Sequence, residues 1–107
     1  MKTTKVVYNA CYGGFSLSTE AVKMAKDVAD PDSKWQRVDE AHGFIDMEGI
    51  ERHDFVLVEV VEKLGDAASG SCAELRIAEI SGGFYRIDEY DGFETVETPD
   101  DIDWVRV

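Results

Sequence analysis

The alternation of apolar and polar positions predicts a strand and then a helix in the first third of the chain. Thr3–Asn9 alternates with a period of two, which is typical of a β-strand. Across Thr19–Ala29 the apolar residues instead recur at helical spacing. Ser18 is a favourable N-cap for this helix, and Pro31 ends it because its ring keeps Asp30 out of the helical region. The predicted core-facing stripe is Ala21, Val22, Ala25, Val28 and Ala29.

The segment Phe55–Leu64 shows a conflict between local preference and periodicity. Its four valines favour a strand. Its apolar residues nevertheless fall on one helical face, while Glu59 and Lys63 lie four residues apart on the other. Asp54 is placed to cap the N-terminus of a helix, and Gly65 is placed to end it. Because the caps and the period agree, we predict a helix.

The segment between the two helices has a weaker pattern. Trp35–Val38 is predicted to form a short strand, and glycines at positions 43 and 49 interrupt the remainder. We expect an irregular connection that is held to the core by apolar side chains. These anchors are Phe44, Ile45, Met47 and Ile50.

The second half returns to strand-like patterns. Ala73–Ile80 and Phe84–Tyr90 are predicted strands. Asp91-Gly92 is a strong signal for a two-residue hairpin turn, which leads into a strand over Phe93–Glu97. A closing strand is predicted over Trp104–Val107.

These elements predict one α+β domain that spans residues 1–107. Two helices should pack on one face of a small, mostly antiparallel sheet. A chain of 107 residues has the size of one ordinary domain, and its 44% hydrophobic content excludes a disordered chain. A domain of this size needs no metal ion or disulfide to hold it together.

The charge balance is strongly acidic. The chain holds 11 Lys and Arg against 23 Asp and Glu, a net charge of −12. Residues 1–54 carry 7 basic and 10 acidic side chains, whereas residues 55–107 carry 4 and 13. This balance argues against direct binding to nucleic acid or to an anionic membrane, because both are bound chiefly through Lys and Arg. It favours a basic protein partner.

Neither a membrane-spanning segment nor a signal peptide is expected. No apolar run is long enough to cross a bilayer, and no signal-peptide pattern follows Met1. We therefore expect a cytosolic protein. In such a reducing compartment Cys11 and Cys72 are expected to be free thiols that pack as small apolar residues.

The loop between the first strand and the first helix is a candidate ligand site. Glycines ahead of a helix N-terminus can present backbone N–H groups to the anion of a nucleotide or another small molecule. The residues of this site are Tyr12, Gly13, Gly14, Phe15 and Ser18. Neither the P-loop pattern nor the dinucleotide fingerprint is present. The alternative is a structural turn in which the glycines adopt positive φ or allow a close backbone approach, with Tyr12 and Phe15 packed on either side.

Cys11 is a candidate nucleophile, because a thiol near a helix N-terminus can be reactive. Leu17 stands where the loop of a cysteine phosphatase needs an arginine, so a base would have to come from His42 or His53 through space. The alternative is that Cys11 is a packed structural residue. The two histidines lack the spacing of a zinc motif, so no metal and no cofactor is predicted.

The second half also supplies a candidate partner surface. Nine carboxylates and one basic residue, Arg86, occur between Glu79 and Asp103. Alternate residues of a strand project from one face about 7 Å apart, a spacing close to that of phosphates along a DNA strand. Such an array would suit a basic protein, as a nucleic-acid mimic or an inhibitor, and the alternative is a solvated acidic face. The predicted contact residues are Asp88, Glu89, Tyr90, Asp91, Phe93 and Glu94, with Trp104 as a further exposed aromatic.

Four stretches of the chain, taken together, resemble a sequence pattern found in other proteins. They are CYGGF-S-LS-x-EA at residues 11–21, R-x-D-x-x-LV-x-VVE-x-LG at 52–65, CA-x-L-x-I-x-EI at 72–80 and I-x-EYDG at 87–92. The set resembles a family of small, uncharacterised proteins of tailed bacteriophages and large DNA viruses. The resemblance covers most of the chain outside roughly residues 30–51. Members often carry Pro after the Asp at the second helix, where this chain has Phe55.

The resemblance implies a viral or prophage accessory protein in the cytoplasm of a bacterial host, and it transfers no catalytic residue. We therefore expect a small, acidic, non-enzymatic phage protein that binds a basic host protein. Two alternatives remain open. One is a nucleotide- or small-molecule-sequestering protein that uses the Gly13-Gly14 loop and the helix N-terminus, and the other is a thiol enzyme that uses Cys11.

Overall fold

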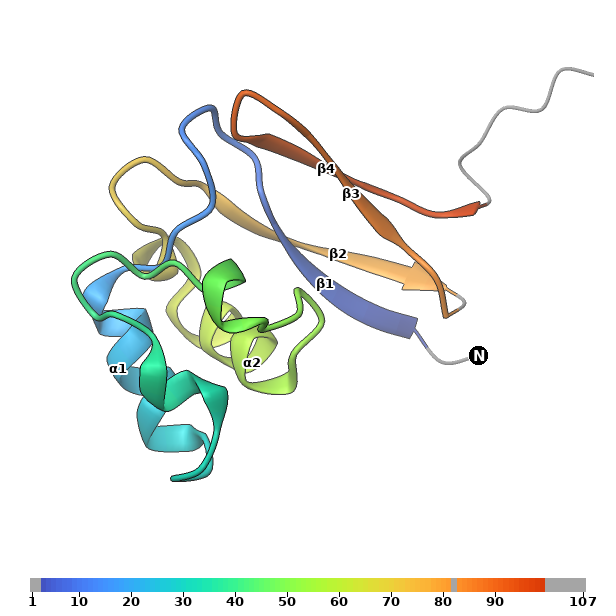
Figure 1. The fold of residues 1–107 in the computed structure, drawn as a ribbon. Helices are drawn as coiled ribbons and strands as arrows, with labels where there is room; N and C mark the ends of the chain where they lie inside the picture. Colours follow the sequence, from blue (N-terminus) through green and yellow to red (C-terminus); the bar gives the residue numbers. More distant parts are fainter. Residues whose placement is uncertain (1–2, 82, 100–107) are drawn as a thin grey trace, which may run out of the picture.

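The computed structural model describes residues 3–81 and 83–99, and it confirms an α+β fold (Figure 1). Within these ranges, two α-helices and two small antiparallel sheets form one globule. The strands and α-helices are β1 (Thr3–Asn9), α1 (Thr19–Val28), α2 (Phe55–Leu64), β2 (Leu75–Ser81), β3 (Arg86–Tyr90) and β4 (Phe93–Glu97). The 3₁₀ helices are η1 (Lys34–Arg37), η2 (Asp46–Glu48) and η3 (Gly65–Ala68).

The first sheet pairs β1 with β2. The strands are antiparallel and in register from Thr3 opposite Ser81 to Asn9 opposite Leu75. Both helices lie on one side of this sheet, and the β3–β4 hairpin lies on the other side (Figure 1). Val7 is fully buried in the core that the sheet shares with the helices. Val6 points to the opposite face by strand alternation and is also fully buried.

The second sheet is the β3–β4 hairpin. Its strands run antiparallel from Arg86 opposite Glu97 to Tyr90 opposite Phe93. The turn residues Asp91 and Gly92 have φ values of 53° and 88°, as a type I′ turn requires. The Asp-Gly signal therefore predicted this hairpin correctly, although the four strands form two sheets rather than one.

The local signals also predicted both helices. Ser18 Oγ accepts a hydrogen bond from Ala21 N at the start of α1, where Ala21 and its neighbours Val22 and Ala25 are buried. Val28 is the exception in the predicted stripe, because it is 43% exposed at the last turn.

The start of α2 is fixed by Asp54. Its Oδ1 accepts hydrogen bonds from Val56 N at 2.9 Å and Leu57 N at 3.2 Å. The same oxygen accepts a bond of 3.1 Å from Nε1 of the buried Trp35, so one carboxylate orders both a helix and the largest core side chain. At the other end Gly65 has a φ of 56° and ends the helix.

Replacing Asp54 with alanine should lower the free energy of unfolding by about 1–2 kcal/mol, because the helix loses its cap and the Trp35 indole loses its acceptor. Urea unfolding followed by circular dichroism measures the change. Asp54→Asn keeps an oxygen acceptor and should retain most of the stability. Equal losses in the alanine and asparagine variants would show that the cap geometry contributes nothing.

Three predictions for the middle segment are wrong. Lys34–Arg37 forms a 3₁₀ helix rather than part of a strand, because Ser33 Oγ accepts from Trp35 N and Val38 N bonds back to Trp35 O. Phe44 and Met47 are 51% and 87% exposed, so they do not anchor the segment to the core. The buried apolar residues are Trp35, Val38, Ile45 and Ile50.

The predicted closing strand Trp104–Val107 lies outside the described residues. Within residues 3–81 and 83–99, no helix has the length and apolar character that crossing a membrane requires.

Candidate functional site

The glycine pair after β1 is explained by close packing between loops. Gly13 has a φ of 127°, and a Cβ there would lie 2.8 Å from the carbonyl oxygen of Cys72. Gly92, in the hairpin turn, lies so close to the backbone nitrogens of Gly13 and Gly14 that it has no room for a Cβ. Gly13 N also donates to Asp91 O at 3.4 Å. The loop is therefore wedged between the hairpin turn and the segment before β2, as the structural alternative proposed.

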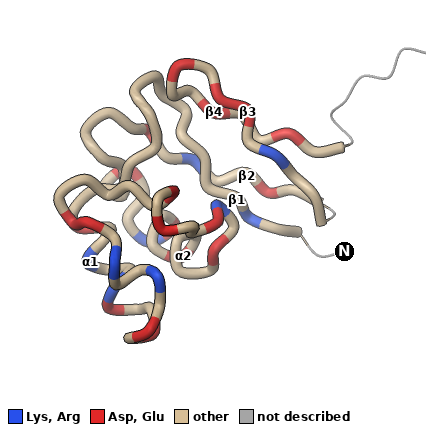
Figure 2. The backbone as a smooth tube through the Cα atoms, viewed as in Figure 1, with Lys and Arg blue, Asp and Glu red and all other residues tan. Residues whose placement is uncertain are grey.

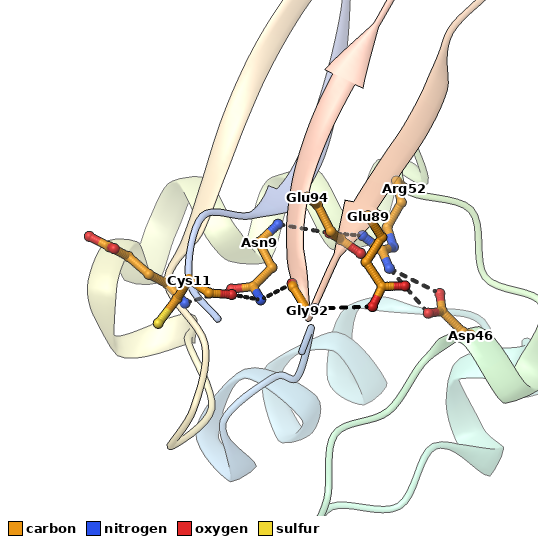
Figure 3. A network of polar contacts seen from close by, with 8 residues as sticks. Asn9, Cys11, Asp46, Arg52, Glu89, Gly92 and Glu94 are labelled. Carbon is orange, nitrogen blue, oxygen red and sulfur yellow. Dashed lines mark hydrogen bonds and ion pairs between the residues drawn. The ribbon is translucent and has the colours of Figure 1, made fainter. Parts of the chain in front are cut away.

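A buried polar network ties the hairpin to the rest of the fold (Figure 3). At its centre is Asn9, which is fully buried at the end of β1. The side-chain Nδ2 donates to Cys11 O and to Gly92 O, both at 2.8 Å. Its Oδ1 accepts from Glu74 N at 2.8 Å, so one amide joins the glycine loop, the hairpin turn and the start of β2.

The second centre of the network is an ion pair between Arg52 and Glu94. Arg52 Nη1 donates to Glu94 Oε1 at 2.5 Å, and the two side chains are only 10% and 7% exposed. The same carboxylate oxygen accepts from Asn9 N at 2.8 Å. Arg52 Nη2 donates to Asp46, and the guanidinium carbon lies 3.9 Å from the centre of the Phe15 ring.

The surroundings keep Arg52 charged. Burial disfavours the charged guanidinium and by itself would lower its pKa. The hydrogen bonds and charges of Glu94 and Asp46 act in the opposite direction, and the pKa of Arg52 is raised above its ordinary value. Both charged partners are largely removed from water. Their ion pair therefore links the segment between η2 and α2 to β4, and we call it the Arg52–Glu94 clamp.

The network corrects one predicted contact residue. Glu94 is 6% exposed and is bound by Arg52 and Asn9 N, so it is not available to a partner. Strand alternation explains why, since Glu94 shares a face with Ile87, Glu89 and Val96 that is turned toward the body of the protein. The sequence contained one signal of this arrangement, a polar Asn9 on the same face of β1 as the buried Val7.

The other predicted contact residues remain at the end of the hairpin and are exposed. Asp88, Glu89 and Asp91 form no ion pair with any residue that the structure describes. Glu89 Oε1 accepts a bond from Gly92 N at 3.2 Å, and Figure 3 shows that this carboxylate lies beside the buried network. These carboxylates therefore present uncompensated negative charge at one end of the molecule.

Aromatic side chains accompany this charge. Tyr90 is 76% exposed and is the cross-strand partner of Phe93. The Phe93 ring in turn lies 5.3 Å from the ring of Tyr12, which is 61% exposed. The sequence pattern does not place Tyr12 on this surface, because Tyr12 lies 76 or more positions before the hairpin residues in the chain. We call the following set the hairpin surface: Tyr12, Asp88, Glu89, Tyr90, Asp91 and Phe93.

Two other described acidic residues of the predicted array, Glu79 and Glu97, do not join the hairpin surface. Glu97 is bound by Arg86 Nη2 at 2.7 Å, and Glu79 is exposed on β2. Asp100, Asp101 and Asp103 lie outside the described residues. Figure 2 shows acidic positions on the helices and on the connections between elements as well as on the hairpin. Of the six carboxylates of the predicted array that the structure describes, three lie together at the hairpin end.

The residues of the predicted ligand site are divided between different surroundings. Phe15 is buried beneath Arg52. Tyr12, Gly13 and Gly14 line a shallow depression together with Glu89 and Asp91. Two carboxylates beside the glycines repel an anion, so the geometry does not favour a phosphate there.

Ser18 faces a different depression, a groove at the start of α1. Its Oγ donates to Ala67 O at 2.6 Å and accepts from Ala21 N, and its backbone N–H donates to Ala68 O. His42 also lines this groove, and its Nδ1 lies 2.9 Å from Asp39 Oδ2. That hydrogen bond holds the pKa of Asp39 below its ordinary value.

Both cysteines are free, in agreement with the prediction. Cys11 is half-buried and its Sγ lies 3.4 Å from Tyr12 O. In the described part of the chain neither histidine is hydrogen-bonded to a cysteine, since His42 contacts Asp39 and His53 contacts Tyr85. Cys72 is exposed rather than packed as predicted.

No cluster of metal-ligating side chains occurs within residues 3–81 and 83–99. Comparison of the chain with protein-family models, with curated proteins and with solved structures finds no match.

Proposed function

We propose that this protein binds a basic protein through the hairpin surface. The observation that carries the proposal is the combination of three exposed, unpaired carboxylates with three exposed aromatic rings at one end of the β3–β4 hairpin. A surface of this kind combines the charged groups and the apolar contact area that protein interfaces use. The charges attract the partner over a distance, and the aromatic rings supply the contact area that stabilises the complex.

The buried network supports this role by making the hairpin rigid. Glu94 and Gly92 are bonded to Asn9, and Glu94 is also bonded to Arg52, so the base of the surface is held at two points. A rigid surface loses less conformational entropy when it binds, which favours affinity. The network thus serves the proposed function although it contacts no partner.

The resemblance to phage and viral proteins adds a setting to this proposal. In that setting the protein is an accessory protein of a phage or prophage, and its partner is a basic host protein in the bacterial cytosol. A host protein with a basic groove for nucleic acid is a suitable target, because Asp88, Glu89 and Asp91 offer a short array of negative charges to it.

Capture from bacterial lysate tests the hairpin surface. The test variant is Asp88→Asn/Glu89→Gln/Asp91→Asn, which removes three charges and keeps the side-chain shapes; Asn tolerates the positive φ at position 91. The native chain should retain basic proteins at low salt and release them at about 1 M salt, where the screening length is about 3 Å. The variant should retain none.

The matched control removes three charges elsewhere. Asp27→Asn/Asp30→Asn/Asp32→Asn changes exposed residues at the end of α1 and just after it, and it should capture the same proteins as the native chain. Equal capture by the hairpin variant and the control would contradict the proposal. Stabilisation of the native chain by a nucleotide, without any capture, would favour the small-molecule alternative.

A further inference from the structure

Among the described residues, no strand pairs with the outer edge of β3. Within the described residues β3 is hydrogen-bonded to β4 alone, and no backbone bond joins it to another segment. In a two-residue hairpin the pair that flanks the turn, here Tyr90 and Phe93, is hydrogen-bonded. Such pairs alternate with non-bonded pairs along an antiparallel ladder. Ile87 and Glu89 therefore direct their backbone N–H and C=O groups away from β4.

We propose that β3 takes up an extended, basic segment of the partner as an added strand. This inference rests on the proposed function and specifies how the partner is held. Main-chain hydrogen bonds to Ile87 and Glu89 would align the partner's segment along β3. The side chains of β3 would determine which segments bind. The inference depends on the backbone N–H and C=O groups of β3 that point away from β4. The acidic side chains next to them indicate that the added strand is basic.

The side chains on β3 call for a basic segment. Asp88 and Tyr90 project from the outer face and Glu89 from the inner face, and all three are exposed. Lysine or arginine residues of an added strand that lie opposite Asp88 would form cross-strand charge pairs, and a neighbouring cation can lie over the Tyr90 ring.

Two other occupants fit less well. The chain's own residues 100–107 carry three aspartates and one arginine, so their negative charge would lie along an acidic strand. The β3 strand of a second copy would place Asp88 and Glu89 near the same residues of the first copy, and like charges across a ladder are unfavourable.

A pair of defined peptides tests the inference on the full chain. The first probe is an alternating lysine–valine peptide of about ten residues, long enough to cover β3. In the antiparallel register that places lysines opposite Asp88 and Tyr90, valines lie opposite Ile87 and Glu89 and donate the ladder hydrogen bonds. The second probe has methyl groups on the valine nitrogens. It keeps the charge and removes those donors.

We expect the first peptide to bind and the methylated peptide to bind about tenfold more weakly or worse, because at least two main-chain hydrogen bonds are lost. Calorimetry measures both affinities. Amide exchange at Ile87 and Glu89, fast in the free protein, should slow when the first peptide is added. Equal affinities for the two peptides, with no protection of these amides, would overturn the strand addition.

The outcomes separate this inference from the proposed function. If both peptides bind equally and binding is lost in the Asp88→Asn/Glu89→Gln/Asp91→Asn variant, the acidic surface stands and the added strand is wrong. If neither peptide binds, both fail. Protected Ile87 and Glu89 amides in the free protein would also overturn the inference. If those amides then exchange quickly in a chain that ends at Pro99, residues 100–107 occupy the edge of β3. If the protein instead forms a concentration-dependent dimer, a second copy occupies it.

Discussion

Replacing Arg52 with methionine should lower the free energy of unfolding by about 3–5 kcal/mol, the largest effect expected from a single substitution in this protein. Methionine keeps much of the length of the arginine side chain and removes its charge. Glu94 would then remain as a carboxylate with 7% exposure and no counter-ion, held only by Asn9 N. The contact of the guanidinium with the Phe15 ring would also be lost. Urea unfolding near neutral pH measures the loss.

The charge argument can be separated from the loss of packing. Adding Glu94→Gln to the Arg52→Met chain removes the isolated buried charge and should restore part of the stability, whereas Glu94→Gln alone should destabilise. Arg37→Met is the matched control. Arg37 is exposed and makes no ion pair with a described residue, so its replacement should change the stability by less than about 0.5 kcal/mol. Strictly additive effects at Arg52 and Glu94 would contradict the clamp.

Replacing Asn9 with alanine should cost about 2–4 kcal/mol, the second largest effect. The substitution removes the fully buried Asn9 side chain and leaves Gly92 O and Glu74 N without their side-chain partners, and each unsatisfied buried group costs about 1–3 kcal/mol. It also loosens the hairpin turn from the glycine loop. Binding to the proposed partner should therefore weaken together with stability, although Asn9 itself is fully buried.

Two measurements check this prediction. Urea unfolding gives the change in stability, and amide exchange at Gly13 and Gly92 reports whether the turn and the loop separate more often. Gln36→Ala removes an amide side chain that is bonded only at the surface and should be nearly neutral. An Asn9→Ala chain as stable as the native protein would show that water replaces the lost bonds.

The elements that carry local signals could be predicted from the sequence. Asp54 and Gly65 mark the ends of α2 although its valines favour a strand, because an N-cap and a glycine terminator act within a few residues of the helix. Asp91-Gly92 similarly specifies its own turn. The Trp35 region was mispredicted because its conformation depends on burial of the indole against distant residues and on its bond to Asp54, 19 positions away.

The candidate site was only partly predictable for the same reason. The exposure of Asp88, Tyr90 and Asp91 follows from a hairpin with one outward face. The burial of Glu94 depends on Arg52, which lies 42 positions earlier in the chain. Nothing in the local pattern of β4 indicates that a distant arginine will pair with its second residue. The place of Tyr12 beside Phe93 depends in turn on how closely the glycine loop packs against the hairpin turn.

An NMR titration of the full chain with the alternating lysine–valine peptide tests the central claim most directly, because it shows where the protein meets a basic ligand. We predict that the largest shift changes fall on the amides of residues 87–93 and on Tyr12, with little change at Ser18, His42 and Cys72. Changes concentrated in the groove that those last three residues line, with an unaffected hairpin, would contradict the account.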